Sequence, residues 1–169
     1  MPKKTTTEPD AIQLLTAQHR EVEDLFEEIE NARHAEDKEA LFSDLADKLT
    51  IHTRIEEQTF YPAVRERRTE AIVLEAFVEH TAIKRSLAEL IQIDAGTAAF
   101  DVQLQALKEL VDEHVEEEEE ELFPVARKAL SDDDLYTLAR EMMYTQQELE
   151  DTEPRLQLRE ELEFMPSFR

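Results

Sequence analysis

Apolar residues recur at steps of three and four along most of the chain, the spacing that places them on one face of an α-helix. Only short breaks interrupt this pattern, at Arg67-Arg68 and around the single glycine, Gly96. Helices joined by short connections run antiparallel to their neighbours in the chain. The sequence therefore predicts an all-α, up-down-up-down four-helix bundle, whose helices cover residues 10–31, 37–66, 69–93 and 100–128.

The remaining segments are predicted to be accessory to this bundle. Ser131 is a suitable N-cap for a short fifth helix, because three aspartates follow it where carboxylates favour the helix dipole. Residues 151–169 are charged and broken by Pro154 and Pro166, so we expect a loosely held C-terminal tail. We expect a disordered segment at residues 1–9, and one domain over residues 10–150.

The two halves of the chain carry the same motif. Residues 52–62 read HTRIEEQTFYP and residues 114–124 read HVEEEEEELFP, so both fit His-x-x-x-Glu-Glu-x-x-x-aromatic-Pro. A lone helical histidine precedes each copy at nearly the same distance, His19 in the first half and His80 in the second. Each half is thus predicted to be a helical hairpin, and a pseudo-twofold axis between the hairpins would bring six side chains together.

Those six side chains all fall on the apolar, core-facing stripes of their helices. An ionised carboxylate in a core costs several kcal/mol without a partner, and Lys84 is one of few cations close in sequence. Bound cations would remove this cost. Imidazole nitrogen and carboxylate oxygen suit iron, manganese, zinc or copper, and carboxylates can bridge two ions. The sequence predicts that the metal ligands are His19, His52, Glu56, His80, His114 and Glu118.

Some positions around the motif stay open to two interpretations. Glu117 and Glu119 are register alternatives to Glu118, and Glu23, one turn from His19, is a possible extra ligand. Tyr61 either packs in the core or serves the site as a redox or hydrogen-bonding group. The prolines that end both motifs predict a kink near each helix end, whether or not the kink shapes the site.

The full pattern resembles the hemerythrin-like family, specifically its HHE cation-binding branch, over roughly residues 10–150. The resemblance implies a four-helix bundle that holds two non-haem iron ions (Fe²⁺/Fe³⁺) with a bridging oxo or hydroxo group. His19, His52, His80 and His114 would be terminal ligands of these ions, and the two glutamates would bridge them.

The chain departs from the oxygen-carrying hemerythrins on its third helix. Those proteins have two histidines there, whereas this chain has His80 alone, with Ala76 and Lys84 one turn away on either side. The departure argues against reversible oxygen transport. Three functions remain: binding or sensing of dioxygen or nitric oxide, an enzyme that decomposes peroxide, and iron storage or buffering. The sequence points to no particular redox partner.

Charge and composition exclude several other classes. The formal net charge is −23, from 19 basic and 42 acidic side chains, which opposes binding to nucleic acid or to anionic membranes. The absence of cysteine excludes disulfides and iron–sulfur clusters, and the single glycine excludes a glycine-rich phosphate loop. No apolar run is long enough for a membrane span or a signal peptide, and we expect a cytoplasmic protein.

Overall fold

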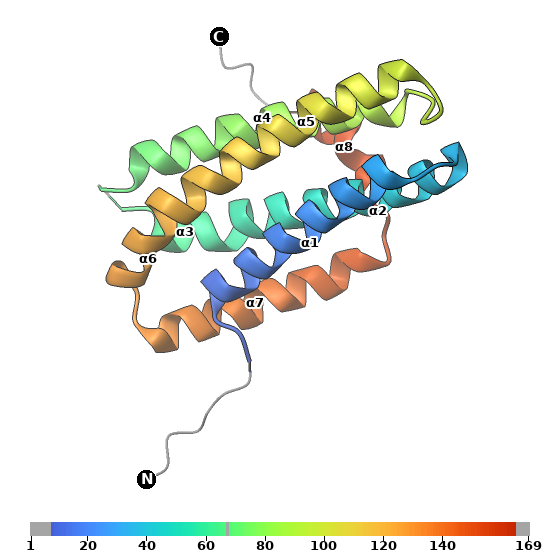
Figure 1. Ribbon diagram of the computed structural model, residues 1–169. Coiled ribbons are helices and arrows are strands. Elements are labelled where there is room, and N and C mark those ends of the chain that lie inside the picture. The colour runs from blue at the N-terminus through green and yellow to red at the C-terminus, as the bar shows by residue number, and fades with distance from the viewer. Residues whose placement is uncertain (1–7, 67, 165–169) are drawn as a thin grey trace.

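The predicted helical bundle is confirmed by the computed structural model, which describes residues 8–66 and 68–164 (Figure 1). In those two ranges the chain forms helices and connections but no strand. No helix in the described part is long and apolar enough to cross a membrane. The predicted disordered segment, residues 1–9, lies outside the described residues except for Glu8 and Pro9. The four long helices are α1 (Ala11–Asn31), α2 (Ala35–Ile55), α4 (Glu70–Ile91) and α5 (Ala98–Glu117).

Local capping explains where several helices begin. The Asp10 side chain accepts a hydrogen bond from the Gln13 N–H at 2.9 Å, and the Gln13 side chain accepts one from the Asp10 N–H. This capping box satisfies two backbone donors that a helix start leaves unpaired. Ser131, the predicted N-cap of the fifth helix, forms the same arrangement with Asp134.

Both motif-bearing helices widen into a single π-helical turn and then continue. The turn ends just before Pro62 in the first half, where the Tyr61 N–H donates to the carbonyl of Glu56, five residues earlier. A proline ring crowds the carbonyl four residues back, so the chain departs from α-helical geometry there. The prolines predicted a kink near each helix end, and the structure shows a π-helical turn there. The segments are η1 (Glu56–Phe60) and α3 (Tyr61–Val64), and η2 (Glu118–Leu122) and α6 (Phe123–Ala129).

The apolar core is divided into two layers by the motif histidines. On α1, Leu15 belongs to one layer and Val22 to the other, with His19 between them. On α4, Val73 and Ile83 flank His80 in the same way. The polar side chains of the motif therefore lie between two water-excluding layers in the middle of the bundle.

The predicted fifth helix is present and is longer than expected. It is α7 (Asp132–Glu150), with 19 residues, nearly the length of α1. Figure 1 shows α7 lying along α1, and it also contacts α2. Leu135, Leu138 and Met142, the apolar side predicted for this helix, are buried.

The prediction of a loosely held tail is wrong for the described residues that follow α7. They form η3 (Pro154–Gln157) and α8 (Leu158–Glu163), which packs on α4. Leu158 is fully buried in the core layer that contains Val22. The backbone N–H and the guanidinium of Arg155 both bind the Asp47 carboxylate, at 3.0 and 2.7 Å. One buried leucine among charged residues was too weak a pattern to predict this docking from sequence.

The docking of α8 predicts a difference between two nearby leucines. Leu158→Ala should lower the free energy of unfolding by about 2–4 kcal/mol, because it removes a fully buried side chain and leaves a cavity. Leu156→Ala is the matched control, since that side chain is 60% exposed. Urea denaturation of both variants measures the difference. Equal stability of the two variants would mean that α8 does not contribute to the core.

Candidate metal centre

All six predicted ligands meet in the middle of the bundle, and all are buried. The four histidines come from the four long helices, one from each. The two glutamates are the first residues of the two π-helical turns, so the irregularity in each helix begins at a predicted ligand. In chain order the residues are His19 on α1, His52 on α2, Glu56 in η1, His80 on α4, His114 on α5 and Glu118 in η2.

The ligand atoms form two groups that share one carboxylate. The first contains His19, His52, Glu56 and Glu118, the second contains Glu56, His80 and His114, and in each the donor atoms lie within 4.8 Å of one another. Glu56 Oε1 is 2.9 Å from His52 Nε2 and 3.2 Å from His80 Nε2. Glu56 thus connects the two halves of the chain.

Glu118 connects the halves in a similar way. Its Oε1 lies 3.2 Å from His19 Nε2 and 3.2 Å from His114 Nε2. The Nε2 atoms of His80 and His114 are themselves only 3.1 Å apart. Each carboxylate therefore faces histidines of both hairpins, so the six side chains converge.

Several of these converging atoms lack a hydrogen bond although they are buried. Among the described residues the unpaired atoms include both carboxylate oxygens of Glu56, Glu118 Oε1, and the Nε2 atoms of His19 and His52. A buried polar atom without a partner costs about 1–3 kcal/mol. A cation between these atoms would satisfy them together, so the donor set fits bound metal.

Each histidine directs its other ring nitrogen outward; this nitrogen meets a side-chain oxygen at hydrogen-bond distance in three of the four, whereas His80 Nδ1 makes no hydrogen bond. An N–H at Nδ1 that faces an acceptor fixes the ring tautomer and leaves the Nε2 lone pair directed inward. This is the usual support for a metal-binding histidine. The distances from Nδ1 are 2.9 Å to Glu119 for His19, 2.7 Å to Gln18 for His52, 3.6 Å to Glu57 for His80 and 2.9 Å to Glu79 for His114.

The repeat contains a signal for these outer partners, which lie outside the set of predicted ligands. Glu57 and Glu119 directly follow the two central glutamates, and Gln18 and Glu79 directly precede the first histidine of each half. Equivalent positions in the two hairpins therefore carry equivalent roles. The sequence does not show which way each helix faces, so these polar side chains could not be distinguished from residues on the solvated surface.

The structure also distinguishes between Glu118 and the other glutamates that the sequence left as possible ligands. Glu118 lies in the cluster, whereas Glu119 lies on the outer side of His19. Glu117 lies beside Glu79, and their hydrogen bond raises the pKa of Glu117 to about 7. Glu23 is outside both groups and pairs with Arg20.

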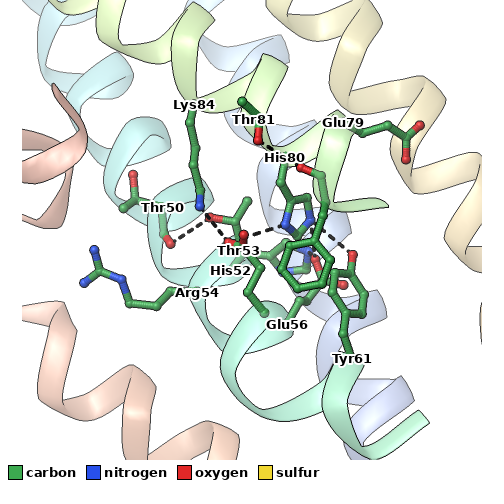
Figure 2. Close-up of polar contacts among 12 residues, drawn as sticks. Thr50, His52, Thr53, Arg54, Glu56, Tyr61, Glu79, His80, Thr81 and Lys84 are labelled. Carbon is green, nitrogen blue, oxygen red and sulfur yellow. Dashed lines mark hydrogen bonds and ion pairs between the residues drawn. The ribbon is translucent and has the colours of Figure 1, made fainter. Parts of the chain in front are cut away.

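Tyr61 is fully buried beside the cluster, and its hydroxyl contacts two of the predicted ligands. It donates a hydrogen bond to Glu118 Oε2 at 2.7 Å and lies 3.1 Å from His80 Nε2, as Figure 2 shows for His80. Burial and the charges of Glu118 and Glu56 raise the pKa of Tyr61 well above its usual value. The hydroxyl therefore keeps its proton, and the hydrogen-bonding role left open for Tyr61 matches its position.

Protons compensate the buried carboxylates in the metal-free protein. Burial acts to lower the pKa of His19, His80 and His114, but the nearby carboxylates outweigh burial and raise all three. Burial acts to raise the pKa of Glu56, yet the charge of His52 and close contacts with neighbouring polar side chains hold it well below its usual range. A metal ion binding here would displace protons from the histidines.

Comparison with known proteins agrees with this geometry. The sequence profile of a family described as the hemerythrin HHE cation binding domain matches residues 10–126. The chain belongs to this family. Membership and the buried cluster of histidines and glutamates together indicate a metal-binding protein, and the predicted HHE resemblance is confirmed.

Two individual proteins are similar to this HHE protein. A DNA nickase from Nostoc sp. is 30% identical over 113 residues, which cover 67% of this chain but only 32% of the nickase. The crystal structure of a hemerythrin HHE cation binding domain-containing protein, the Rv2633c homolog from Mycobacterium kansasii, superposes with a TM-score of 0.77. It is 24% identical and the match covers 86% of this chain and 90% of that one, which shows a shared fold.

The raised pKa values of the site histidines and the lowered pKa of Glu56 predict how the stability of the metal-free protein depends on pH. The raised histidine pKa values stabilise the folded state. This contribution is fully present below about pH 6.5 and is lost as pH rises through the raised values. The lowered pKa of Glu56 contributes stability above about 4.5, which is lost as pH falls. The midpoint of thermal unfolding should therefore decline from pH 6 to pH 9.

Calorimetry with a chelator present measures this decline. The metal-loaded protein is the control, since it has the same surface charge, and its midpoint should change less over that range because metal replaces the protons. A metal-free midpoint that stays constant or increases from pH 6 to pH 9 would contradict the assignment of the protons.

Proposed function

We propose that this HHE protein holds two non-haem iron ions and that it binds or reacts with a small oxidant there, such as dioxygen, hydrogen peroxide or nitric oxide. The observation that carries the proposal is the position of Glu56, whose carboxylate belongs to both donor groups. A carboxylate shared by two groups of histidines is suited to two neighbouring cations in a bundle core.

The donor set fits a transition metal, and the family likeness is what favours iron. Four imidazoles and two carboxylates suit iron, as they also suit manganese, zinc or copper, and the likeness to hemerythrins favours iron. Two divalent ions more than neutralise the two carboxylates, so a bridging oxo or hydroxo group is expected to complete the balance. Six protein donors also leave coordination positions open on two six-coordinate ions.

The residues of the chain would divide the work at this site. His19 and His52 would hold one ion and His80 and His114 the other, with Glu56 shared between both groups. Glu118, whose Oε1 lies 3.2 Å from the Nε2 atoms of both His19 and His114, would be the second shared carboxylate. Iron, when bound, supplies the coordination of a small oxidant and the exchange of electrons with it. The apolar layers on both sides of the cluster exclude bulk water, so only small molecules would reach the site.

A second candidate is an enzyme that decomposes peroxide, and Tyr61 is the observation that favours it. Its hydroxyl is protonated, buried and directed at Glu118 Oε2 and His80 Nε2. A group in that place can hold or donate a proton at the site where a small oxidant would react. A protein that only binds a gas has less need for such a donor.

Two other activities are supported less well. Six donors match two ions, whereas iron storage requires space for many more. Nicking of DNA is the printed activity of one relative, but the chain spans about a third of that protein, and a net charge of −23 opposes the approach of nucleic acid.

Iron content tests the shared role of Glu56. The wild-type protein loaded with Fe(II) without oxygen should hold two ions per chain, and Glu56→Gln should lose most of both because it removes the shared charge. Glu117→Gln is the matched control, since Glu117 lies outside the donor groups, and should keep two ions. Elemental analysis after desalting gives the counts. Two ions retained by Glu56→Gln would refute the shared carboxylate.

Peroxide turnover tests the role of Tyr61. If the protein is an enzyme, Tyr61→Phe should lower turnover per iron about 100-fold, because a positioned acid or base contributes about that much or more. Iron content should stay near wild type, since the phenyl ring still fills the core. Steady-state oxygen evolution from peroxide gives the rates. Unchanged turnover in Tyr61→Phe would remove the hydroxyl from the reaction.

A further inference from the structure

A buried lysine lies next to the metal centre and belongs to neither donor group. Lys84 is on α4, one turn after His80, and only 1% of it is exposed. Its Nζ lies 2.6 Å from Glu57 Oε2 and 2.9 Å from Glu161 Oε1. Figure 2 shows its ammonium end on one side of the His80 ring, with Tyr61 on the other. A charge this deeply buried persists only when it is paired.

The oxygen that Lys84 holds is the one that faces His80. Glu57 Oε2 is 3.6 Å from His80 Nδ1, an ion-pair distance longer than a hydrogen bond, and this nitrogen lies on the side of the ring away from the cluster. The same Glu57 oxygen therefore lies between the Lys84 ammonium and the outer nitrogen of His80. Glu161, Lys84, Glu57 and His80 therefore form one continuous series of contacts that ends at a predicted ligand.

The other half of the chain carries a similar series that is open to solvent. Arg20 donates to the Glu119 carboxylate, which accepts from His19 Nδ1 at 2.9 Å. Arg20 is 51% exposed, and water and salt weaken such a pair. Lys84 is instead enclosed, and its second carboxylate comes from α8. The two halves thus differ in the burial of the cation behind the outer carboxylate, which is exposed in the first half and buried in the second.

We propose that Lys84 and Glu161 are positioning residues for His80, so that α8 is a working part of the metal centre. Glu161 holds the ammonium in place, Lys84 holds the Glu57 carboxylate, and Glu57 orients the His80 ring with Nε2 toward the cluster. Glu161 lies beyond residues 10–126, where the family profile matches. This inference rests on the proposed function, because it requires metal at His80.

Glu161→Gln tests this series of contacts, because glutamine has nearly the shape of glutamate but no charge. The substitution removes one of the two negative charges that compensate Lys84, and the ammonium then draws more of the Glu57 charge away from His80. Loss of an outer partner of a metal-binding histidine lowers metal affinity about 10- to 100-fold. Glu161→Gln leaves that partner, Glu57, in place, so we expect a loss at the low end, about 10-fold, for one of the two ions and less than about twofold for the other.

Two control variants separate this effect from damage to α8. Glu161 also contacts Arg54 at 3.3 Å, so Arg54→Gln breaks that contact while Lys84 and Glu161 stay paired. Glu160→Gln changes an exposed neighbour on the same helix. Both should bind metal like wild type. Lys84→Gln should weaken the same ion as Glu161→Gln, and the double variant should be no weaker than the worse single variant, because the residues act in series.

Anaerobic titration of the full chain with Fe(II) against a competing chelator measures both affinities. A second readout is nitrogen NMR of the histidine rings in the zinc-loaded protein, where Glu161→Gln should shift the His80 Nδ1 resonance and leave that of His19 unchanged. Wild-type affinity for both ions in Glu161→Gln, or equal weakening of both ions, overturns the inference alone. A wild-type chain that binds fewer than two ions overturns the proposed function, and this inference with it.

Discussion

Two glutamates in the middle of an apolar bundle are the constraint on which the rest of the structure depends. Glu56 is fully buried and Glu118 nearly so, with core layers above and below them. Removing two carboxylates from water costs several kcal/mol each unless cations accompany them. Four histidines face these carboxylates, and they can be charged themselves or can share metal ions. The bundle is therefore built around charge compensation at its centre.

The helices meet this constraint through local irregularity and through support from outside. A π-helical turn begins at each glutamate and ends before a proline, which is the kind of site where such turns carry function. A side-chain oxygen lies on the outer side of each histidine ring, at hydrogen-bond distance for all but His80. The two accessory helices take part in this support. From α7, Gln146 accepts from Gln18, the partner of His52, and from α8, Glu161 binds Lys84.

The sequence contained most of the fold and the inner site, for physical reasons that can be named. Helical spacing of apolar residues predicts the bundle, and the repeat predicts which histidines and glutamates converge, because His52 and Glu56 one turn apart must share a face. The C-terminal segment was missed because its docking depends on Leu158 and on pairing with Asp47, far away in the sequence. Helical spacing places Lys84 one turn from His80, but its pairing with Glu161 spans 77 residues of the chain and depends on the docking of α8.

The distance between two bound metal ions tests the central claim most directly. X-ray absorption on the Fe(II)-loaded protein should show nitrogen and oxygen neighbours and a second iron at about 3.5–4 Å, the separation typical of two-metal sites. That result is expected because one carboxylate belongs to both donor groups. Iron bound at a single isolated position, with no iron neighbour in the fully loaded protein, would contradict the account.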